Sequence, residues 1–434
     1  MTILLRNGLI FDGEKLVEKP KDVLIEGGRI QKVGETQPQR GMGNHTYDLD
    51  GKIVCPGFID LHVHLRDPGQ EWREDIPSGA LAAAAGGFST VVAMPNTEPP
   101  IDCASLVQYV MDRGMNSQGA RVLPAGTVTK GRSGERLAEL AKMAAAGAVF
   151  FTDDGSPVWK SGLLHKALLY TRNLGVRIME HPEDLDLSRG AQVNWGYSSS
   201  RSGLKGSPVS SEVSDIHRGI HLCEETGSPV HFTHVSSKKG IEAVRLAKRQ
   251  GLSVTADVTC HHLVFDESAV VESRYDSLFK VNPPLRSSTD RDALWEGICD
   301  GTVDAIITDH APYHSDEKDV PFQEAPFGIA SLECAVAAVL TEWNNRGKPC
   351  PLERMLYLWT AGPARLLPKK WSELGKIREG GPADITVLDP GIEKTVDPSL
   401  WRSKAKMTPW KGRTFANWPI MTIVEGRIVF GETE

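Results

Sequence analysis

Between residues 56 and 370, short β-rich runs alternate with amphipathic helical stretches along the chain. Eight β-rich runs can be counted, at residues 58–65, 89–96, 121–129, 148–154, 177–183, 229–235, 253–260 and 305–310. Helical stretches between them include 135–146, 213–225, 239–249 and 291–299. This alternation is typical of βα units on a parallel sheet, because parallel neighbours need a crossover connection. Eight units favour a TIM-type (β/α)8 barrel over the alternative, an open doubly wound sheet.

The two ends of the chain follow a different pattern. Apolar runs at 22–34 and 421–430 each enclose a tight turn, at Gly27-Gly28 and Glu425-Gly426, and such runs indicate β-hairpins. Further strand-like runs lie at 52–54 and 383–388. We therefore predict a small β domain built from residues 1–55 and 371–434, with a barrel of residues 56–370 inserted between its two halves.

Composition and charge exclude several classes of function. The chain has 40% hydrophobic and 24% charged residues, as ordinary soluble globular proteins do. A net charge of −7 offers no overall attraction for nucleic acid or an anionic membrane. The uncharged stretch 76–97 could suggest a membrane span, but prolines and Gly86-Gly87 divide it, so we expect a buried helix followed by a strand. Neither nucleic acid nor a membrane is expected as a partner.

The cysteines and glycines narrow the chemistry further. Seven cysteines are scattered without a CxxC pair, which argues against a disulfide framework and a thiolate zinc site and favours a reducing cytoplasm. The N-terminal apolar run is broken at Arg6, too early for a signal peptide. No GxGxxG or GxxxxGK[ST] sequence follows a predicted strand, so neither a dinucleotide nor a P-loop site is supported.

Imidazole and carboxylate groups gather at the predicted strand ends. Strand alternation puts His62 and His64 on one face above Asp60, with residues 61, 63 and 65 turned toward the helices. Four further strand ends carry such groups, in Asp153-Asp154, His181, His234 and Asp309-His310. Any one of these could be a turn or a core residue, but the strand ends of a barrel meet on one face. Together they predict a site for Zn²⁺ or a similar divalent ion.

Six short motifs lie at the ends of predicted strands or in the segments that follow them: His62-Val63-His64-Leu65-Arg66, Met94-Pro95-Asn96-Thr97, Thr152-Asp153-Asp154-Gly155, Asn282-Pro283-Pro284-Leu285-Arg286, Thr308-Asp309-His310-Ala311-Pro312 and Ala325-Pro326-Phe327-Gly328-Ile329. They resemble the motifs of the type I bacterial dihydroorotases, within the amidohydrolase superfamily. The resemblance runs nearly end to end. It implies a zinc-dependent cyclic amide hydrolase that interconverts dihydroorotate and N-carbamoyl-L-aspartate in pyrimidine biosynthesis.

The resemblance also implies a set of metal ligands. His62 and His64 would bind one ion together with Asp309, and His181 and His234 would bind a second. Zinc is the expected metal, with one or two ions per chain.

Two aspartates would have special roles by this resemblance. Asp154 would bridge the two ions, at the position where many relatives carry a carboxylated lysine. The neighbouring Asp153 faces the opposite way along the strand and is the weaker candidate. Asp309 would be both a ligand and the group that takes a proton from water and returns it to the leaving ring nitrogen.

Substrate-binding residues follow from the same resemblance. Arg66 and Asn96 would hold the substrate carboxylate, while Asn282 and the backbone around Gly328 would meet the polar edge of the ring.

The sequence departs from the family pattern just after the eighth strand. The family usually has Asp-His-Ala-Pro-His there, with the last His touching the substrate carboxylate, whereas this chain has Tyr313 and a histidine only at His314. We expect one of these two residues to make that contact. The polar segment 313–325 that they open is predicted to be a mobile loop beside the metal site.

Two other functions are considered. A different cyclic amidohydrolase, a hydantoinase or allantoinase, is disfavoured by the Asp154 position and by Arg66 and Asn96, which suit a carboxylate. A non-catalytic scaffold for aspartate transcarbamoylase is disfavoured because all six ligands are present. A homodimer and a complex with aspartate transcarbamoylase are both considered as assemblies, and the sequence does not choose between them.

Overall fold

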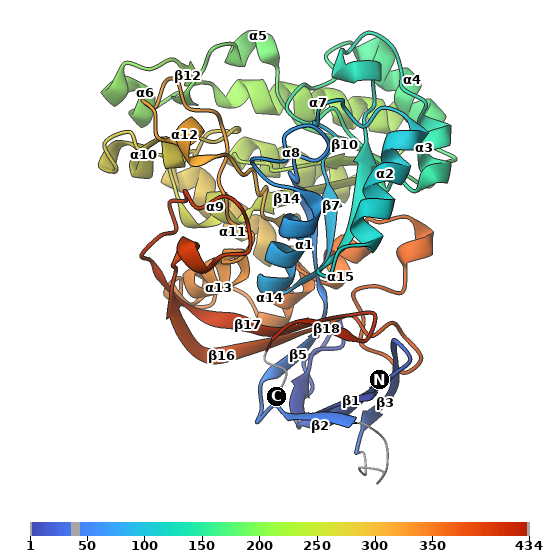
Figure 1. The fold of residues 1–434 in the computed structure, drawn as a ribbon. Coiled ribbons are helices and arrows are strands. Elements are labelled where there is room, and N and C mark those ends of the chain that lie inside the picture. The colour runs from blue at the N-terminus through green and yellow to red at the C-terminus, as the bar shows by residue number, and fades with distance from the viewer. Residues whose placement is uncertain (1, 36–43, 432–434) are drawn as a thin grey trace.

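The computed structural model describes residues 2–35 and 44–431, and within them it places two large sheets side by side (Figure 1). The first sheet comes from both ends of the chain. Its strands are β1 Thr2–Ile10, β2 Lys21–Glu26, β3 Arg29–Gly34, β4 Asn44–Asp48, β5 Ile53–Pro56, β16 Ile385–Thr395, β17 Thr414–Val424 and β18 Arg427–Phe430.

Antiparallel pairing of β5 with β16 joins the two halves of this terminal sheet, with Ile385 opposite Pro56. Both predicted hairpins are present, as β2 with β3 and β17 with β18. Apolar side chains of the terminal sheet, among them Ile3, Val23 and Ile423, form a separate apolar core. The predicted β domain from both termini is therefore confirmed, and we keep residues 56 and 370 as the proposed limits of the inserted part.

The second sheet is the predicted barrel. Its strands follow one another in chain order, all in parallel: β6 Phe58–Val63, β7 Phe88–Ala93, β8 Arg121–Gly126, β9 Phe150–Phe151, β10 Arg177–Glu180, β13 Val230–Phe232, β14 Val254–Thr259 and β15 Ala305–Ile307. The last strand returns to the first, because Val63 bridges His310 and the His64 amide donates to the His310 carbonyl at 2.8 Å. This closure confirms the TIM-type barrel.

Helices surround the barrel (Figure 1). The longer ones are α1 Ile76–Ala85, α2 Ala104–Met115, α3 Leu140–Ala146, α4 Ser161–Thr171, α7 Val209–Thr226, α8 Lys238–Arg249, α11 Ser288–Cys299 and α13 Ala335–Asn345. Short elements are α5 Leu185–Ser188, β11 Val193–Asn194, α6 Tyr197–Ser202, β12 Gly206–Ser207, α9 Cys260–Val264, α10 Ser268–Glu272, α12 Ser315–Lys318, α14 Leu352–Tyr357 and α15 Ala361–Ala364, with 3₁₀ turns η1 Lys130–Arg132, η2 Ser277–Phe279, η3 Lys369–Trp371 and η4 Pro398–Leu400.

Most helix predictions are confirmed, including the buried helix and strand at 76–97, which are α1 and β7. The prediction for 135–146 is wrong at its start, because α3 begins only at Leu140. The residues before α3 instead make backbone hydrogen bonds with the segment that follows β8. The Lys130 amide donates to the Arg136 carbonyl at 2.9 Å, and the Ala138 amide donates to the Val128 carbonyl at 3.0 Å. The Arg136 carbonyl and the Ala138 amide therefore have hydrogen-bond partners outside a helix.

The side-chain alternation of β6 also differs from the prediction. Val63 and Leu65 pack in the large cluster that contains the helices, as expected. Leu61 instead packs with Ile59 and Met179, in a cluster that joins strands on opposite sides of the barrel and therefore lies inside it. The pairing of β6 with β7 shifts register between Asp60 and Val63, and such an irregularity redirects side chains.

Within the described residues, no helix combines the length and apolar character needed to cross a membrane.

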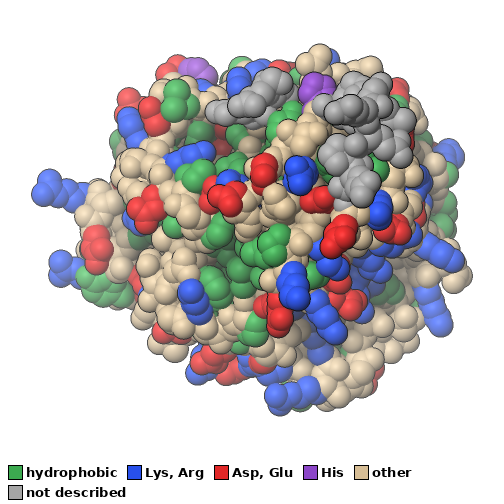
Figure 2. Space-filling model, turned by 90° about the horizontal axis from the view of Figure 1, so that it is seen from below, with side chains coloured by type: hydrophobic (Ala, Val, Ile, Leu, Met, Phe, Trp, Pro, Cys, Tyr) green, Lys and Arg blue, Asp and Glu red, His purple; other side chains and the backbone are tan. Residues whose placement is uncertain are grey.

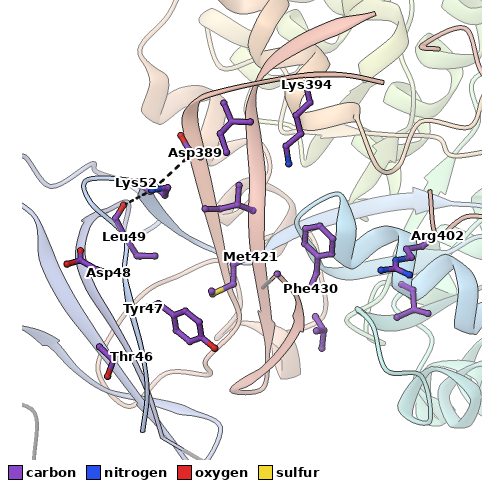
Figure 3. Close-up of a pocket in the computed structure, with 15 residues that line it drawn as sticks. Thr46, Tyr47, Asp48, Leu49, Lys52, Asp389, Lys394, Arg402, Met421 and Phe430 are labelled. Atoms are coloured by element: carbon purple, nitrogen blue, oxygen red, sulfur yellow. Dashed lines mark hydrogen bonds and ion pairs between the residues drawn. The ribbon is translucent and has the colours of Figure 1, made fainter. Parts of the chain in front are cut away.

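A cavity of about 990 Å³ lies against the terminal sheet. There Tyr47 points toward the strand that carries Met421, and Lys52 pairs with Asp389 at 3.8 Å (Figure 3). Seen from below, hydrophobic side chains gather near the middle of this face, with charged side chains of both signs around them (Figure 2). Neither the cavity nor its lining includes any residue predicted to act in the site.

Candidate metal centre and active site

A smaller cavity of about 340 Å³ opens at the carboxyl ends of the barrel strands. Its lining includes the five predicted substrate-binding residues and all predicted ligands except His62, whose side chain is fully buried. Barrel enzymes place their sites at this end, so the smaller cavity and not the larger one is the candidate active site.

The first group of ligand atoms comes from β6, the β9 end and the β15 end. His62 Nε2 lies 3.4 Å from Asp154 Oδ1 and 3.6 Å from Asp309 Oδ1. His64 Nε2 lies 3.1 Å from Asp309 Oδ1 and 3.7 Å from Asp154 Oδ2. Four side chains from three distant parts of the sequence therefore converge on one point.

The second group shares Asp154 with the first. His181 Nδ1 and His234 Nε2 lie 3.4 Å and 3.6 Å from Asp154 Oδ1, and they lie 2.9 Å from one another. Asp154 thus belongs to both groups of residues that are spaced to hold an ion. This placement supports the proposal that Asp154 bridges two ions.

The chemistry of these atoms fits a divalent ion. His62 Nε2 is buried and has no hydrogen-bond partner among the described residues. Its distances to the two carboxylates exceed those of ordinary N–H···O hydrogen bonds but suit atoms that share an ion. Imidazole nitrogens and carboxylate oxygens are typical zinc ligands. The site is accordingly a metal-binding group of His and Asp residues.

Electrostatics favour the exchange of protons for a metal. Burial by itself lowers the pKa of His62, but the charge of Asp154 outweighs it and raises this pKa to about 9. Burial opposes protonation of His181 as well, yet its hydrogen bonds to Asp154 and Glu183 raise its pKa to about 10. An imidazole must lose its proton to bind a metal, so an ion replaces the protons held at these two positions.

The two ligand carboxylates, Asp309 and Asp154, stay ionised. Burial would raise the pKa of Asp309, but the hydrogen bond with His64 and the charge of His62 hold it well below its usual range. Burial would also raise the pKa of Asp154, and the charge of His62 with hydrogen bonds from His181 and His234 lowers it far more. Both groups are therefore available as ligands or proton acceptors at neutral pH.

Asp153 faces away from this cluster, as strand alternation predicted. Its Oδ1 accepts the backbone N–H groups of Val128 and Thr129 at 2.9 and 3.1 Å, and its Oδ2 accepts the Thr129 hydroxyl. Burial raises the pKa of Asp153 to about 6 despite these contacts. The Asp153 carboxylate therefore stabilises the loop after β8 through hydrogen bonds and is directed away from the ligand atoms.

The two neighbouring aspartates should therefore respond differently to substitution by asparagine. We expect Asp154→Asn to lose metal on dialysis, whereas Asp153→Asn should retain it and unfold at a lower temperature. In the second variant an NH₂ group faces buried donors, which costs roughly 1–3 kcal/mol. Elemental analysis and thermal unfolding measure the two effects. Greater metal loss from Asp153→Asn would reverse the assignment.

Three site residues have left-handed backbone conformations at strand ends, with φ values of 60° at Arg66, 41° at His234 and 44° at Asp309. Such conformations are uncommon for residues other than glycine, and they persist where the surrounding structure holds them. They turn the chain sharply just where a polar side chain has to point into the cavity.

Asn96 makes contacts that the sequence did not predict. Its Oδ1 lies 2.9 Å from His64 Nδ1, and its Nδ2 donates to Asp154 Oδ2 at 3.2 Å. The amide therefore orients two candidate ligands as well as lining the cavity. Outer contacts of this kind fix the tautomer and direction of a ligating histidine.

Sequence reasoning missed further supporting residues. His62 Nδ1 lies 2.9 Å from Thr233 Oγ1, which donates to the Asp257 carboxylate at 3.2 Å. Asp257 also accepts the backbone N–H of His234 at 2.5 Å. A carboxylate inside the apolar run 253–260 was the signal that could have revealed Asp257. Arg132, which lines the cavity and donates to the Asp154 carbonyl, carried no such signal.

The predicted substrate-binding residues line the same cavity as the candidate ligands. Arg66 is buried, and its Nε donates to the Pro312 carbonyl at 3.3 Å. Within residues 2–35 and 44–431, no hydrogen bond engages its two terminal nitrogens, which suits a carboxylate. The N–H of Gly328 donates to the Lys280 carbonyl at 2.8 Å, so only its carbonyl is left for a ring. A Cβ at Gly328 would meet the Ala311 carbonyl at 2.6 Å, so this close approach requires glycine.

Tyr313 and His314 lie in different surroundings. The Tyr313 ring lines the cavity, with the guanidinium groups of Arg66 and Arg73 at 4.7 and 4.8 Å from its centroid. His314 is half exposed and caps α12, where its Nδ1 accepts the Asp316 amide at 3.4 Å. Only Tyr313 is therefore brought to the site. That the segment 313–325 is mobile stays a prediction.

Comparisons with known proteins agree with this geometry. A model of the Dihydro-orotase-like family matches residues 51–240. Dihydroorotases from Pelotomaculum thermopropionicum and Anaeromyxobacter dehalogenans are 44% and 43% identical, each over 99% of this chain and 98% of the relative. Among solved structures, the L-hydantoinase from Arthrobacter aurescens is 25% identical with a TM-score of 0.87, and the match covers 100% of this chain and 96% of the hydantoinase.

Proposed function

Because the chain belongs to the dihydroorotase family, we infer that it catalyses the reversible cyclisation of N-carbamoyl-L-aspartate to dihydroorotate in pyrimidine biosynthesis. It is a cyclic amidohydrolase, as the hydantoinases with the same fold are. The observation that carries this assignment beyond family membership is the convergence of six ligand side chains beside a cavity that is also lined by a buried Arg66 with unengaged terminal nitrogens. Such a site is suited to an amide that carries a carboxylate.

Zinc is the metal that we propose for this centre. His62, His64 and Asp309 would hold one ion, His181 and His234 would hold a second, and Asp154 would bridge them. A bound divalent ion supplies Lewis acidity, which lowers the pKa of water and polarises the carbonyl group of the substrate. Elemental analysis of the zinc-loaded protein distinguishes one ion per chain from two.

Asp309 is proposed to move the proton. In ring opening, the water oxygen forms a bond to the amide carbon and the bond from that carbon to the ring nitrogen breaks. The ionised Asp309 takes the proton that water releases and delivers it to the departing nitrogen. Ring closure uses the same transfers in reverse, with water as the leaving molecule.

Arg66 is proposed to hold the substrate carboxylate through its terminal nitrogens, with Asn96 beside it. Asn282 and the Gly328 carbonyl would meet the polar edge of the ring. Because the substrate is fixed at both ends, the amide carbon faces the ligand cluster, and orientation of this kind lowers the activation barrier.

Turnover of dihydroorotate, followed by ultraviolet absorbance, tests the proposed function against its alternatives. We expect the metal-loaded protein to open dihydroorotate much faster than hydantoin or allantoin, because these two lack the carboxylate that Arg66 would bind. Faster turnover of hydantoin or allantoin would assign the site to another cyclic amidohydrolase. No turnover of any of the three would favour a scaffold.

Tyr313 should carry the contact that a histidine makes in most of the family. Loss of one hydrogen bond to a charged group costs roughly 1.5–3 kcal/mol, about ten- to a hundredfold in kcat/KM. We expect Tyr313→Phe to lose activity by that factor and His314→Ala, whose side chain lies outside the cavity, to remain near the parent. Steady-state kinetics with dihydroorotate measure kcat/KM for both variants. Normal activity in both variants would leave the carboxylate to Arg66 and Asn96.

The assembly and location of the protein stay predictions. We propose that either a homodimer or a complex with aspartate transcarbamoylase forms, which sedimentation of the protein alone and with the transcarbamoylase distinguishes. The cytoplasmic location that the scattered cysteines suggest is also a proposal.

A further inference from the structure

Glu183 connects the metal ligands with the proposed substrate-binding side. It follows His181 by two residues, on the loop after β10, and its side chain is largely buried. Glu183 Oε2 lies 2.9 Å from His181 Nε2 and accepts from Asn282 Nδ2 at 3.1 Å. A single carboxylate oxygen therefore meets one candidate ligand and one candidate substrate-binding amide.

The contact determines which nitrogen of His181 can bind a metal. An ionised carboxylate only accepts hydrogen bonds, so the nitrogen that faces it, Nε2, must carry the proton. The lone pair of the neutral ring then lies on Nδ1, which is the atom directed at His234 and Asp154. Glu183 thus selects the tautomer in which His181 can act as a ligand.

The same reasoning applies to the amide of Asn282. Because Glu183 can only accept, Asn282 must present its NH₂ group to it, and Oδ1 is then the amide atom left for the cavity that Asn282 lines. Dihydroorotate has ring N–H groups, and N-carbamoyl-aspartate has the N–H groups of its ureido end. An acceptor in this position matches these donors.

We propose that Glu183 is a positioning residue that holds His181 as an Nδ1 ligand and Asn282 with its amide oxygen toward the N–H edge of the substrate. This inference rests on the proposed function, since it presumes that substrate. It assigns one residue to two tasks, metal retention and recognition of the ureido edge. These tasks can be measured separately.

Metal affinity is the first measurement. The metal-free protein is titrated with Zn²⁺ in competition with a chromophoric chelator, which requires no turnover. Removal of an outer contact to a ligand typically weakens metal binding about 10- to 100-fold, and we expect this loss in Glu183→Ala. Glu183→Gln keeps a carbonyl oxygen for both donors without the charge, so its loss should be smaller.

A matched control separates positioning from a general effect on the loop. Asp184 is the next residue, and its side chain caps α5 by accepting the backbone amides of Asp186 and Leu187 at 3.0 and 3.3 Å. Asp184→Ala should loosen the same loop and yet leave the affinity for Zn²⁺ and the KM for dihydroorotate unchanged. Thermal unfolding of both variants shows whether each is folded.

Substrate recognition is the second measurement, read from KM in a double-mutant cycle with Asn282→Ala. If Glu183 acts through Asn282, Glu183→Ala should raise KM about tenfold in the parent, an effect of one lost hydrogen bond, and much less in the Asn282→Ala background. The weaker binding of Zn²⁺ should persist in both backgrounds.

Three results would overturn the proposal: parent-like zinc affinity and KM in Glu183→Ala, equal losses in Glu183→Ala and Asp184→Ala, or additive effects of Glu183→Ala and Asn282→Ala on KM. Failure of the parent itself to open dihydroorotate would instead contradict the proposed function, and the zinc titration would still test the contact with His181.

Discussion

Asp309→Asn is expected to lower kcat for dihydroorotate by about 10²- to 10⁴-fold, the usual contribution of a general acid-base group. The ionised Asp309 carboxylate follows the last barrel strand, β15, and its Oδ1 lies 3.1 Å from His64 Nε2. The histidines around it keep it deprotonated. An amide of the same shape can still offer one oxygen to a metal but cannot accept a proton. Steady-state kinetics in both directions should show the same factor, because ring opening and ring closure share the transfer.

Metal content has to be measured on the same samples, so that loss of the ion is distinguished from loss of the proton acceptor. Asp186→Asn is a suitable control, because it makes the same chemical change at a side chain that is 86% exposed and pairs with the exposed Arg189. If Asp309→Asn retains metal and works within about threefold of the parent, far above the range for a lost acid-base group, Asp309 does not move the proton.

Replacement of His62 and His64 together by alanine should abolish both metal retention and turnover. Their Nε2 atoms supply the two imidazole ligands of the first group, and only carboxylates would remain there. Neutral imidazole is a strong ligand for zinc, and two carboxylates alone leave a poorer site. Elemental analysis after dialysis against excess zinc and removal of free metal gives the stoichiometry.

The chain offers a matched control for this double replacement. His217 and His221 lie four residues apart on α7, and His221 is 77% exposed in its side chain. Removal of these two histidines should leave stoichiometry and kcat unchanged. Metal retained at the parent level by the His62→Ala/His64→Ala protein would show that the ion binds elsewhere.

Local pattern was sufficient for much of the fold. Strands buried on both faces are nearly continuous apolar runs, so the eight barrel strands could be located within a few residues. The histidines and aspartates at their ends could be found because polar groups interrupt those runs. That they meet follows from closure of a barrel, in which parallel strands end at one rim.

Pattern failed where long-range pairing changes what a residue does locally. Leu61 faces inward because β6 shifts register against β7, which alternation along a single strand cannot show. Residues 135–139 have a helical composition, yet two of them, Arg136 and Ala138, make backbone hydrogen bonds to the segment just after β8. These bonds outweigh a weak intrinsic preference.

The sequence by itself determined which side chains form the candidate ligand set, because each strand end is encoded by the residues around it. Only the tertiary structure decided what supports that set. Glu183 and Asn282 are 99 residues apart, and Thr233 and Asp257 are 24 apart, so no local period relates them. Their contacts exist because the closed barrel brings neighbouring strand ends and loops within hydrogen-bond distance, where buried polar groups must find partners.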